Sequence, residues 1–267
     1  MSSIASFIQR DAGSADPVDW NSYAKCYDVL CGMNPAYQVL LQEFRTFLRR
    51  IEVREELSVL DVGAGSGNFL MEVGSEFSDR ASMTHLDADG VMNELANAKY
   101  RKANLQVTFV EENARVANFP AASFDMVVSV NALYAIPEPK TVLRSCLTWL
   151  KPGGYLYLVN LGRMQNTFEW TLYLIRHNVK TLGWLRTLSI LMNEGRTLSA
   201  QNRKITQAQA KGTYWSHSTP ELGATLRELG YVVTHLDTCY RGYSDIAICR
   251  RPTDTCAPTL GDKLAPQ

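Results

Sequence analysis

The stretch Leu57-Ser-Val-Leu-Asp-Val-Gly-Ala-Gly-Ser-Gly67 decides the fold. It begins as a short apolar run that stops at glycines, which is typical of a buried strand in a parallel sheet. Gly63, Gly65 and Gly67 let the backbone turn tightly and approach a ligand closely. A helix that starts after this loop would offer free N–H groups and a partial positive charge to that ligand. The stretch therefore predicts a strand, a loop and a helix with a ligand site at the turn.

Strand-like and helix-like stretches alternate along the chain after this unit. We expect further strands near 81–87, 106–111, 124–130 and 154–160, and helices near 67–76, 90–103 and 138–150. This alternation implies right-handed crossovers and a parallel sheet covered on both faces. Residues 231–240 and 243–250 then predict two strands joined tightly in a hairpin.

Capping signals mark the starts of two further helices. Pro35 suits the first position of a helix that begins after Asn34, within a helical pattern that runs from Trp20 to Ile51. Ser218 can cap a second helix, and Glu221, three residues later, can complete a capping box.

The composition argues against several classes of protein. Lys plus Arg equals Asp plus Glu at 27 each, so no net charge draws the chain toward nucleic acid. The six cysteines form no CxxC pair and no metal-site spacing with histidine, so we expect no metal and reduced thiols in a cytoplasmic setting. We expect neither a signal peptide nor a membrane span, because no apolar run is long enough.

Two classes of ligand compete for the glycine loop. The dinucleotide fingerprint GxGxxG, counted from Gly63, would put its third glycine at Asn68. Asp61 would bring negative charge toward a pyrophosphate, whereas it suits a ligand that carries an ammonium group. Asp87 ends the second strand, where a carboxylate can accept hydrogen bonds from both ribose hydroxyls. The pattern favours an aminoacyl nucleoside, and a nicotinamide-dependent oxidoreductase is the alternative.

Four landmarks in chain order carry a resemblance to a known family. They are Val59–Phe69 around the glycine loop, Asp87, Ser123–Val130 and Leu150–Leu158. In these landmarks the chain resembles the class I S-adenosylmethionine-dependent methyltransferases of the small-molecule type. The resemblance covers roughly residues 55–160 and about the last 50 residues. It implies S-adenosylmethionine as the cofactor.

The resemblance also implies the complete architecture. We expect a Rossmann-like α/β fold: a seven-stranded, mostly parallel sheet with the last strand antiparallel, helices on both faces and a helical cover insertion. The expected segments are a flexible tail (1–16), N-terminal helices that form part of the active-site cover (17–54), the cofactor-binding core (55–162), the helical substrate-cover insertion (163–217), a C-terminal helix and β-hairpin that complete the core (218–251) and a second flexible tail (252–267).

A set of cofactor-binding residues follows from the same resemblance. The expected contacts are Asp61, Gly63, Ala64 and Gly65 at the methionine end, Asp87 at the ribose, Ala88 beside the adenine, Asn131 near the sulfonium methyl, and Tyr23 and Tyr27 folded over the cofactor. After the third strand the family usually has Asp and a small residue; this chain has Asn113-Ala114, whose Asn can still accept a hydrogen bond from the adenine amine. Tyr23 and Tyr27, four apart on one helix face, are equally open to a packing role.

The loop after the fourth strand bears on the methyl acceptor. It reads Asn131-Ala-Leu-Tyr-Ala-Ile-Pro137, whereas a methyltransferase acting on nucleic acid bases would typically show Asn-Pro-Pro-Tyr, so nucleic acid is not expected. A general base is needed only where the acceptor must lose a proton, as a hydroxyl does. The catalytic candidates are Tyr134, His177 and His217; His85 and His235 lie in predicted strands and are expected to be structural.

The stretch 163–217 is helical in composition, rich in apolar and aromatic side chains, and also basic. Apolar walls with a few polar groups build small-molecule pockets, so we expect an apolar or aromatic acceptor with an acidic group. Two alternatives stay open: a helix pair that buries its own apolar stripe, and a surface in peripheral contact with a membrane.

We therefore predict methyl transfer from S-adenosylmethionine to oxygen or nitrogen of a small metabolite. A carbon or sulfur acceptor is the alternative within the family. A cofactor-binding protein without catalysis is the alternative from another class. No pattern in the sequence specifies the oligomeric state.

Overall fold

The computed structural model describes residues 20–52, 56–193 and 195–253. The predicted tail at 1–16 and residues 254–267 of the second predicted tail lie outside the described residues. No helix in the described ranges is long and apolar enough to cross a membrane.

The described residues form a seven-stranded sheet with the strand order β3-β2-β1-β4-β5-β7-β6. The strands are β1 (Leu57–Val62), β2 (Ala81–Leu86), β3 (Val107–Val110), β4 (Phe124–Val130), β5 (Leu150–Leu161), β6 (Val232–Cys239) and β7 (Ser244–Arg250). β7 runs antiparallel to both of its neighbours, and the pairs among β1 to β5 are parallel. The predicted fold class is confirmed, and the parallel pairing brings the carboxyl ends of β1, β2 and β4 to one edge.

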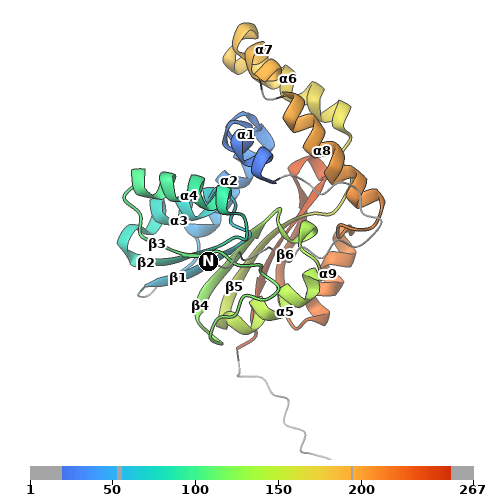
Figure 1. The fold of residues 1–267 in the computed structure, drawn as a ribbon. Coiled ribbons are helices and arrows are strands. Elements are labelled where there is room, and N and C mark those ends of the chain that lie inside the picture. The colour runs from blue at the N-terminus through green and yellow to red at the C-terminus, as the bar shows by residue number, and fades with distance from the viewer. Residues whose placement is uncertain (1–19, 53–55, 194, 254–267) are drawn as a thin grey trace, which may run out of the picture.

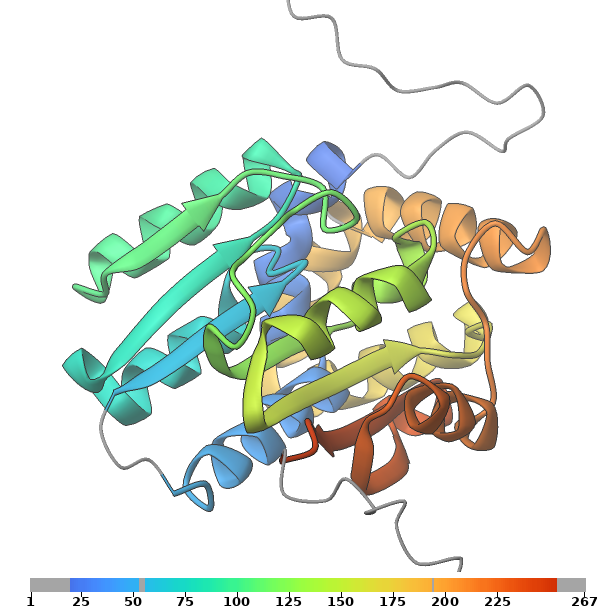
Figure 2. The same cartoon turned by 90° about the horizontal axis from the view of Figure 1, so that it is seen from below.

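Helices cover both faces of this sheet (Figures 1 and 2). One face carries α2 (Pro35–Leu48), α3 (Asn68–Phe77) and α4 (Gly90–Lys102), and the other carries α5 (Pro139–Trp149) and α9 (Thr219–Glu228). Short 3-10 turns lie at η1 (Ser78–Arg80), η2 (Leu133–Ala135) and η3 (Tyr240–Gly242). Each face has its own buried apolar core, as the two-residue period of a central strand requires.

Strand β5 shows this alternation of side chains between the two faces of the sheet. Tyr157 and Val159 pack with the α2 and α3 side, whereas Leu156 and Leu158 pack with the α5 and α9 side. All four side chains are fully buried. The nearly continuous apolar sequence of β5 is therefore explained by burial on both faces.

The capping signals act as the sequence predicts. Oδ1 of Asn34 accepts a hydrogen bond from the N–H of Ala36 at 3.1 Å, and Pro35 opens α2. At α9, the carboxylate of Glu221 accepts a hydrogen bond from the N–H of Ser218 at 2.7 Å. Such contacts satisfy backbone donors that a helix start leaves free.

A second group of helices gathers at the carboxyl end of the sheet (Figure 1). It consists of α1 (Trp20–Met33), α6 (Thr167–Leu182), α7 (Trp184–Asn193) and α8 (Gly195–Ala210). The insertion thus holds three helices rather than a pair. α7 does not bury its apolar stripe, since Trp184 is 61% and Leu185 83% exposed.

Candidate active site

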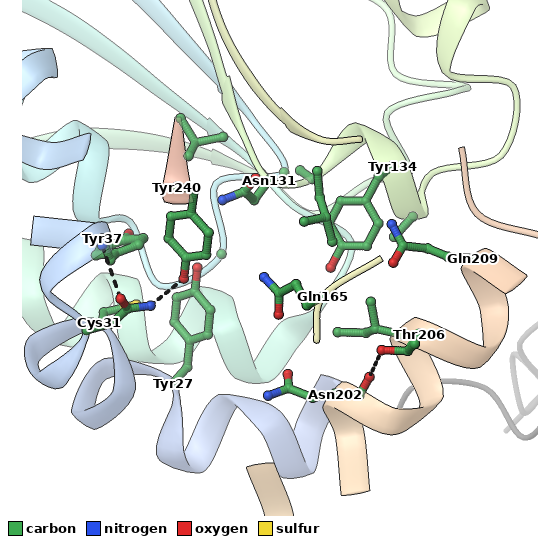
Figure 3. A pocket seen from close by; sticks show the side chains of 18 of the residues that line it. Tyr27, Cys31, Tyr37, Asn131, Tyr134, Gln165, Asn202, Thr206, Gln209 and Tyr240 are labelled. Atoms are coloured by element: carbon green, nitrogen blue, oxygen red, sulfur yellow. Dashed lines mark hydrogen bonds between the residues drawn. The ribbon is translucent and has the colours of Figure 1, made fainter. Parts of the chain in front are cut away.

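A cavity of about 960 Å³ lies between the carboxyl edge of the sheet and the gathered helices (Figure 3). One part of its wall comes from the loops after β1, β2, β3 and β4. The other part comes from α1, α6, α8 and the turn between β6 and β7. The cavity therefore sits where parallel α/β sheets place their ligands.

The three glycines of the loop have different neighbours. All three have positive φ: 70° at Gly63, 54° at Gly65 and 79° at Gly67. A Cβ atom at Gly63 would lie 2.4 Å from Cβ of Ala132, and one at Gly67 would lie 2.1 Å from the Tyr100 hydroxyl. A Cβ at Gly65 would meet no atom within 4 Å. Two glycines thus serve packing, and Gly65 leaves open space beside the cavity.

Asp87 links the glycine loop to the end of β2. Its Oδ2 accepts a hydrogen bond from the N–H of Gly65 at 2.7 Å, and its Oδ1 accepts one from the N–H of Asp89 at 2.9 Å. Burial raises the pKa of this carboxyl, while the backbone donors act in the opposite direction. Each oxygen keeps a lone pair, so the carboxylate can still receive donors from the cavity.

Asp61 lies beneath the loop rather than on the cavity wall. Its residue is 2% exposed, and its Oδ2 is buried without a hydrogen-bond partner among the described residues. Burial, with the nearby charge of Asp87, raises the pKa of this carboxyl to about 8. Ala64 is likewise absent from the wall; its N–H donates to the carbonyl of Leu86 at 3.2 Å. A buried, unpartnered carboxyl oxygen favours an ammonium group nearby.

The residues expected at the adenine lie together. Ala88, Asn113 and Ala114 all line the cavity. Oδ1 of Asn113 accepts a hydrogen bond from the N–H of Arg115 at 3.0 Å, which orients the amide. The oxygen keeps one further acceptor site.

Asn131 and Tyr134 also line the cavity (Figure 3). Asn131 has φ 49°, and its Oδ1 accepts a hydrogen bond from the Ser244 hydroxyl at 3.0 Å. Tyr27 also lines the cavity from α1. The side chain of Tyr23 lies outside the described part of the structure.

The two candidate histidines are not brought to the cavity. His177 lies on α6, and neither it nor His217 is among the lining residues. His217 is buried against the paired strands β5 and β7: its Nδ1 lies 3.2 Å from Oδ2 of Asp245, and its Nε2 lies 2.8 Å from Nδ2 of Asn160. The Asn160 amide donates to Nε2, so the proton of a neutral ring sits on Nδ1 and faces Asp245. This geometry gives His217 a structural task.

The basic residues of the insertion differ in whether they line the cavity. Arg163 binds Asp245 through two nitrogens, at 3.0 and 2.9 Å, and this pair holds the start of the insertion to β7. Neither Arg176 nor Arg186 lines the cavity. Arg203 of α8 is the cation of the insertion that lines the cavity among the described residues, and its side chain is exposed.

Several cavity residues were not anticipated from the sequence. They are mostly neutral and polar: Asn34, Tyr37, Gln165, Ser199, Asn202, Thr206, Gln209 and Tyr240. Those on α8 recur at helical spacing, and this regular polar stripe is the signal that could have revealed them. Tyr240, which like Arg241 adopts positive φ in the hairpin turn, also lines the cavity.

The residues present fit S-adenosylmethionine. The space beside Gly65 is open, and the adjacent carboxylate of Asp87 is a group that the hydroxyls of a ribose would suit as donors. The buried Oδ2 of Asp61 lacks a hydrogen-bond donor among the described residues, and an ammonium group is a donor that would suit it. The carboxylate of Asp87 on the cavity wall opposes a diphosphate, because like charges would be brought together.

The comparisons with known proteins agree with this chemistry. A family model described as "Methyltransferase domain" matches residues 59–154. The ubiquinone biosynthesis O-methyltransferase of Xanthomonas axonopodis pv. citri is 33% identical over 111 residues, which are 41% of this chain and 45% of that protein. The ubiquinone/menaquinone biosynthesis C-methyltransferase of Shewanella sediminis is 26% identical over 45% of this chain and 49% of its own length. The chain thus spans about half the length of these curated relatives.

A solved structure extends the likeness to the fold as a whole. The crystal structure of a SAM-dependent methyltransferase from Aquifex aeolicus superposes with a TM-score of 0.56 and 17% identity, over 86% of this chain and 97% of that one. At this identity the likeness concerns the fold. The family match, the sheet order and the glycine loop together show that the chain contains a class I methyltransferase domain whose cofactor is S-adenosylmethionine.

Proposed function

We propose that the protein transfers the methyl group of S-adenosylmethionine to oxygen or nitrogen of a small metabolite with an apolar or aromatic frame. This proposal rests on one observation: Gly65, Asp87 and Asn131 line the same cavity as residues of α6 and α8. Cofactor and acceptor would thereby meet side by side in one cavity, and methyl transfer requires such proximity.

The bound cofactor supplies an already activated methyl group, so the chain mainly has to hold and orient its ligands. Gly65 leaves room for the cofactor, and Asp87 accepts the ribose hydroxyls. Apolar side chains such as Leu161 and Leu174 exclude water from the acceptor's side of the cavity. Tyr134, buried in the wall, is the candidate that touches an acceptor hydroxyl, and in its phenolate form it would accept the proton that this hydroxyl must lose.

The proposal also concerns the partners and alternatives. The cavity supports a small-molecule acceptor over nucleic acid. The exposed Trp184 and Leu185 on α7, beside Arg186, support peripheral contact with a membrane surface, which vesicle flotation would test.

Two alternatives to this function remain. The relatives include an O- and a C-methyltransferase, so a carbon or sulfur acceptor is the alternative reaction. A cofactor-binding protein without catalysis is the alternative class.

Calorimetry and turnover test the proposal in sequence. S-adenosylmethionine and S-adenosylhomocysteine should bind, whereas NADH should not. Asp87→Asn should weaken the cofactor by about tenfold through lost charge-assisted hydrogen bonds. Asp79→Asn, at the amino end of β2, is the matched control. Failure to bind S-adenosylmethionine contradicts the proposal.

Methyl-labelled cofactor offered with a panel of phenols, amines, thiols and enolisable ketones would then identify the acceptor atom. Labelled phenol ethers or methylamines support the proposal. Label on carbon or sulfur favours the alternative reaction. Binding without any formation of S-adenosylhomocysteine would favour the non-catalytic class.

A further inference from the structure

Helix α8 turns a polar face toward the cavity. Asn202, Thr206 and Gln209 follow one another at intervals of four and three residues, so they share one side of the helix, and all three line the cavity (Figure 3). The Thr206 hydroxyl donates to the carbonyl of Asn202 at 2.9 Å, which leaves its oxygen able to accept. A helix that served only to cover the cavity would present apolar side chains there.

Gln209 differs from the other residues of this face because its amide is buried without a hydrogen-bond partner among the described residues. It is 6% exposed, and both its Nε2 and its Oε1 are buried without a hydrogen-bond partner among the described residues. A buried polar group without a partner destabilises a protein, because it loses its hydrogen bonds to water. Such a group is expected where a ligand supplies the missing partner.

The surroundings of Gln209 indicate what that partner must be. Gln209 lines the cavity, and its buried amide is turned toward Tyr134 (Figure 3). Tyr134 packs with Leu161 and with Ile205 of α8 in one apolar cluster. No lining residue in the described part of α8 is acidic, and its cation Arg203 is exposed. An amide offers one acceptor and two donors but no charge.

We propose that Gln209 is a specificity-determining residue that binds a neutral carbonyl or hydroxyl group of the methyl acceptor. The amide then selects acceptors that carry such an oxygen on an apolar frame. The terminal torsion of a glutamine is soft, so a small rotation aims the amide at its ligand. This inference rests on the proposed function for the name of the ligand, but its tests do not require turnover.

The first test uses thermal unfolding of the ligand-free protein. Gln209→Leu replaces an unpartnered amide by an apolar group of similar size and should raise Tm by about 2–6 °C. Gln201→Leu is the matched control: Gln201 lies on the same helix, is also 6% exposed, and has an interaction partner. Its substitution should lower Tm. A lower Tm for Gln209→Leu overturns the proposal, because it would mean that the amide stabilises the fold.

The second test measures ligand choice with S-adenosylhomocysteine present. Acetophenone and α-methylstyrene have nearly the same shape, but only the first carries a carbonyl oxygen. The wild type should favour acetophenone by about tenfold, and Gln209→Leu should remove this preference while still binding α-methylstyrene. Equal affinities in the wild type, or no binding of either, overturn the proposal. If the preference holds but no methyl is ever transferred, the proposed function fails and the recognition by Gln209 stands.

Discussion

The N–H of Gly65 donates a hydrogen bond to Oδ2 of Asp87 across 2.7 Å, and this contact ties the glycine loop to the end of β2. Because β1 and β2 pair in register from Leu57–Ala81 to Val62–Leu86, the two residues lie at one edge although 22 positions separate them. The bond fixes the carboxylate of Asp87 beside the open space at Gly65. The relationship predicts that loop and carboxylate act together in cofactor binding.

Substituting the glycines separates packing from ligand access. Gly65→Ala should lower the free energy of unfolding by about 1–2 kcal/mol, because φ is 54°, and should weaken S-adenosylmethionine at least tenfold, because the new methyl enters ligand space. Gly63→Ala adds a collision with Ala132 and should cost about 2–4 kcal/mol. Denaturant unfolding and calorimetry measure both effects.

Gly212→Ala provides the matched control for backbone strain. Gly212 also has positive φ, 71°, with no atom within 4 Å of a new Cβ, and it does not line the cavity. Its substitution should reduce stability like Gly65→Ala but leave cofactor affinity unchanged. Unchanged affinity in Gly65→Ala as well would contradict the assigned role of the loop.

The raised pKa of Asp61 predicts a proton release on cofactor binding. At pH 7 the free protein holds this carboxyl mostly protonated, because its pKa is about 8. An ammonium group beside it favours the ionised form, so about one proton should leave per cofactor bound. Calorimetry at pH 7 in buffers of different ionisation enthalpy counts that proton, and Asp61→Asn should abolish the release. An unchanged proton count in Asp61→Asn would place the ammonium group elsewhere.

Asp245 should contribute to stability in a defined pH range. Burial would raise its pKa, but hydrogen bonds from His217, Arg163 and Thr219 outweigh burial and lower the pKa to about 2. Because the pKa of Asp245 is lower in the folded than in the unfolded state, its ionised carboxylate stabilises the fold at pH values above the unfolded-state pKa of about 3.9. This stabilisation is lost as the pH falls toward 2. Asp245→Asn should cost about 3 kcal/mol at pH 7 and flatten the acid limb of the stability curve.

The control for this carboxylate is Asp237→Asn, on the exposed strand β6. Surface substitutions of this kind change stability by about 0.5 kcal/mol or less. Urea unfolding at pH 3, 5 and 7 compares the two variants. If both variants lose the same free energy of unfolding at pH 7, the hydrogen bonds of buried Asp245 have no special role in stability.

The two candidate histidines should respond differently to alanine. His217→Ala removes partners of Asp245 and Asn160 and should cost about 1–3 kcal/mol of stability, with kcat retained below the unfolding transition. His177→Ala, outside the cavity, should change neither stability nor kcat appreciably. Full activity of both variants on the true acceptor excludes histidine as the base. A large fall in kcat at unchanged stability would restore it.

Local patterns predicted much of the fold because their physical causes are local. The strand at Phe124–Val130 agrees at both ends with the predicted range, and most other elements agree within one or two residues. The glycine loop, the Asn34-Pro35 helix start and the Ser218–Glu221 cap depend on a few neighbouring residues. Apolar periodicity could not predict how many helices the insertion holds, because the cavity side of α8 is polar.

The sequence by itself determined the strands of the parallel sheet, the turn with its three glycines, and the two carboxylates at strand ends, whereas the full seven-stranded architecture was implied by the family resemblance. These features follow from backbone sterics and from the periodicity of burial. Only the tertiary structure decided which side chains meet. It joined His217 to Asp245, 28 positions later, and turned Gln209 and Tyr240 into the cavity. Contacts of this kind depend on how distant helices and strands pack, and no short stretch of sequence encodes that packing.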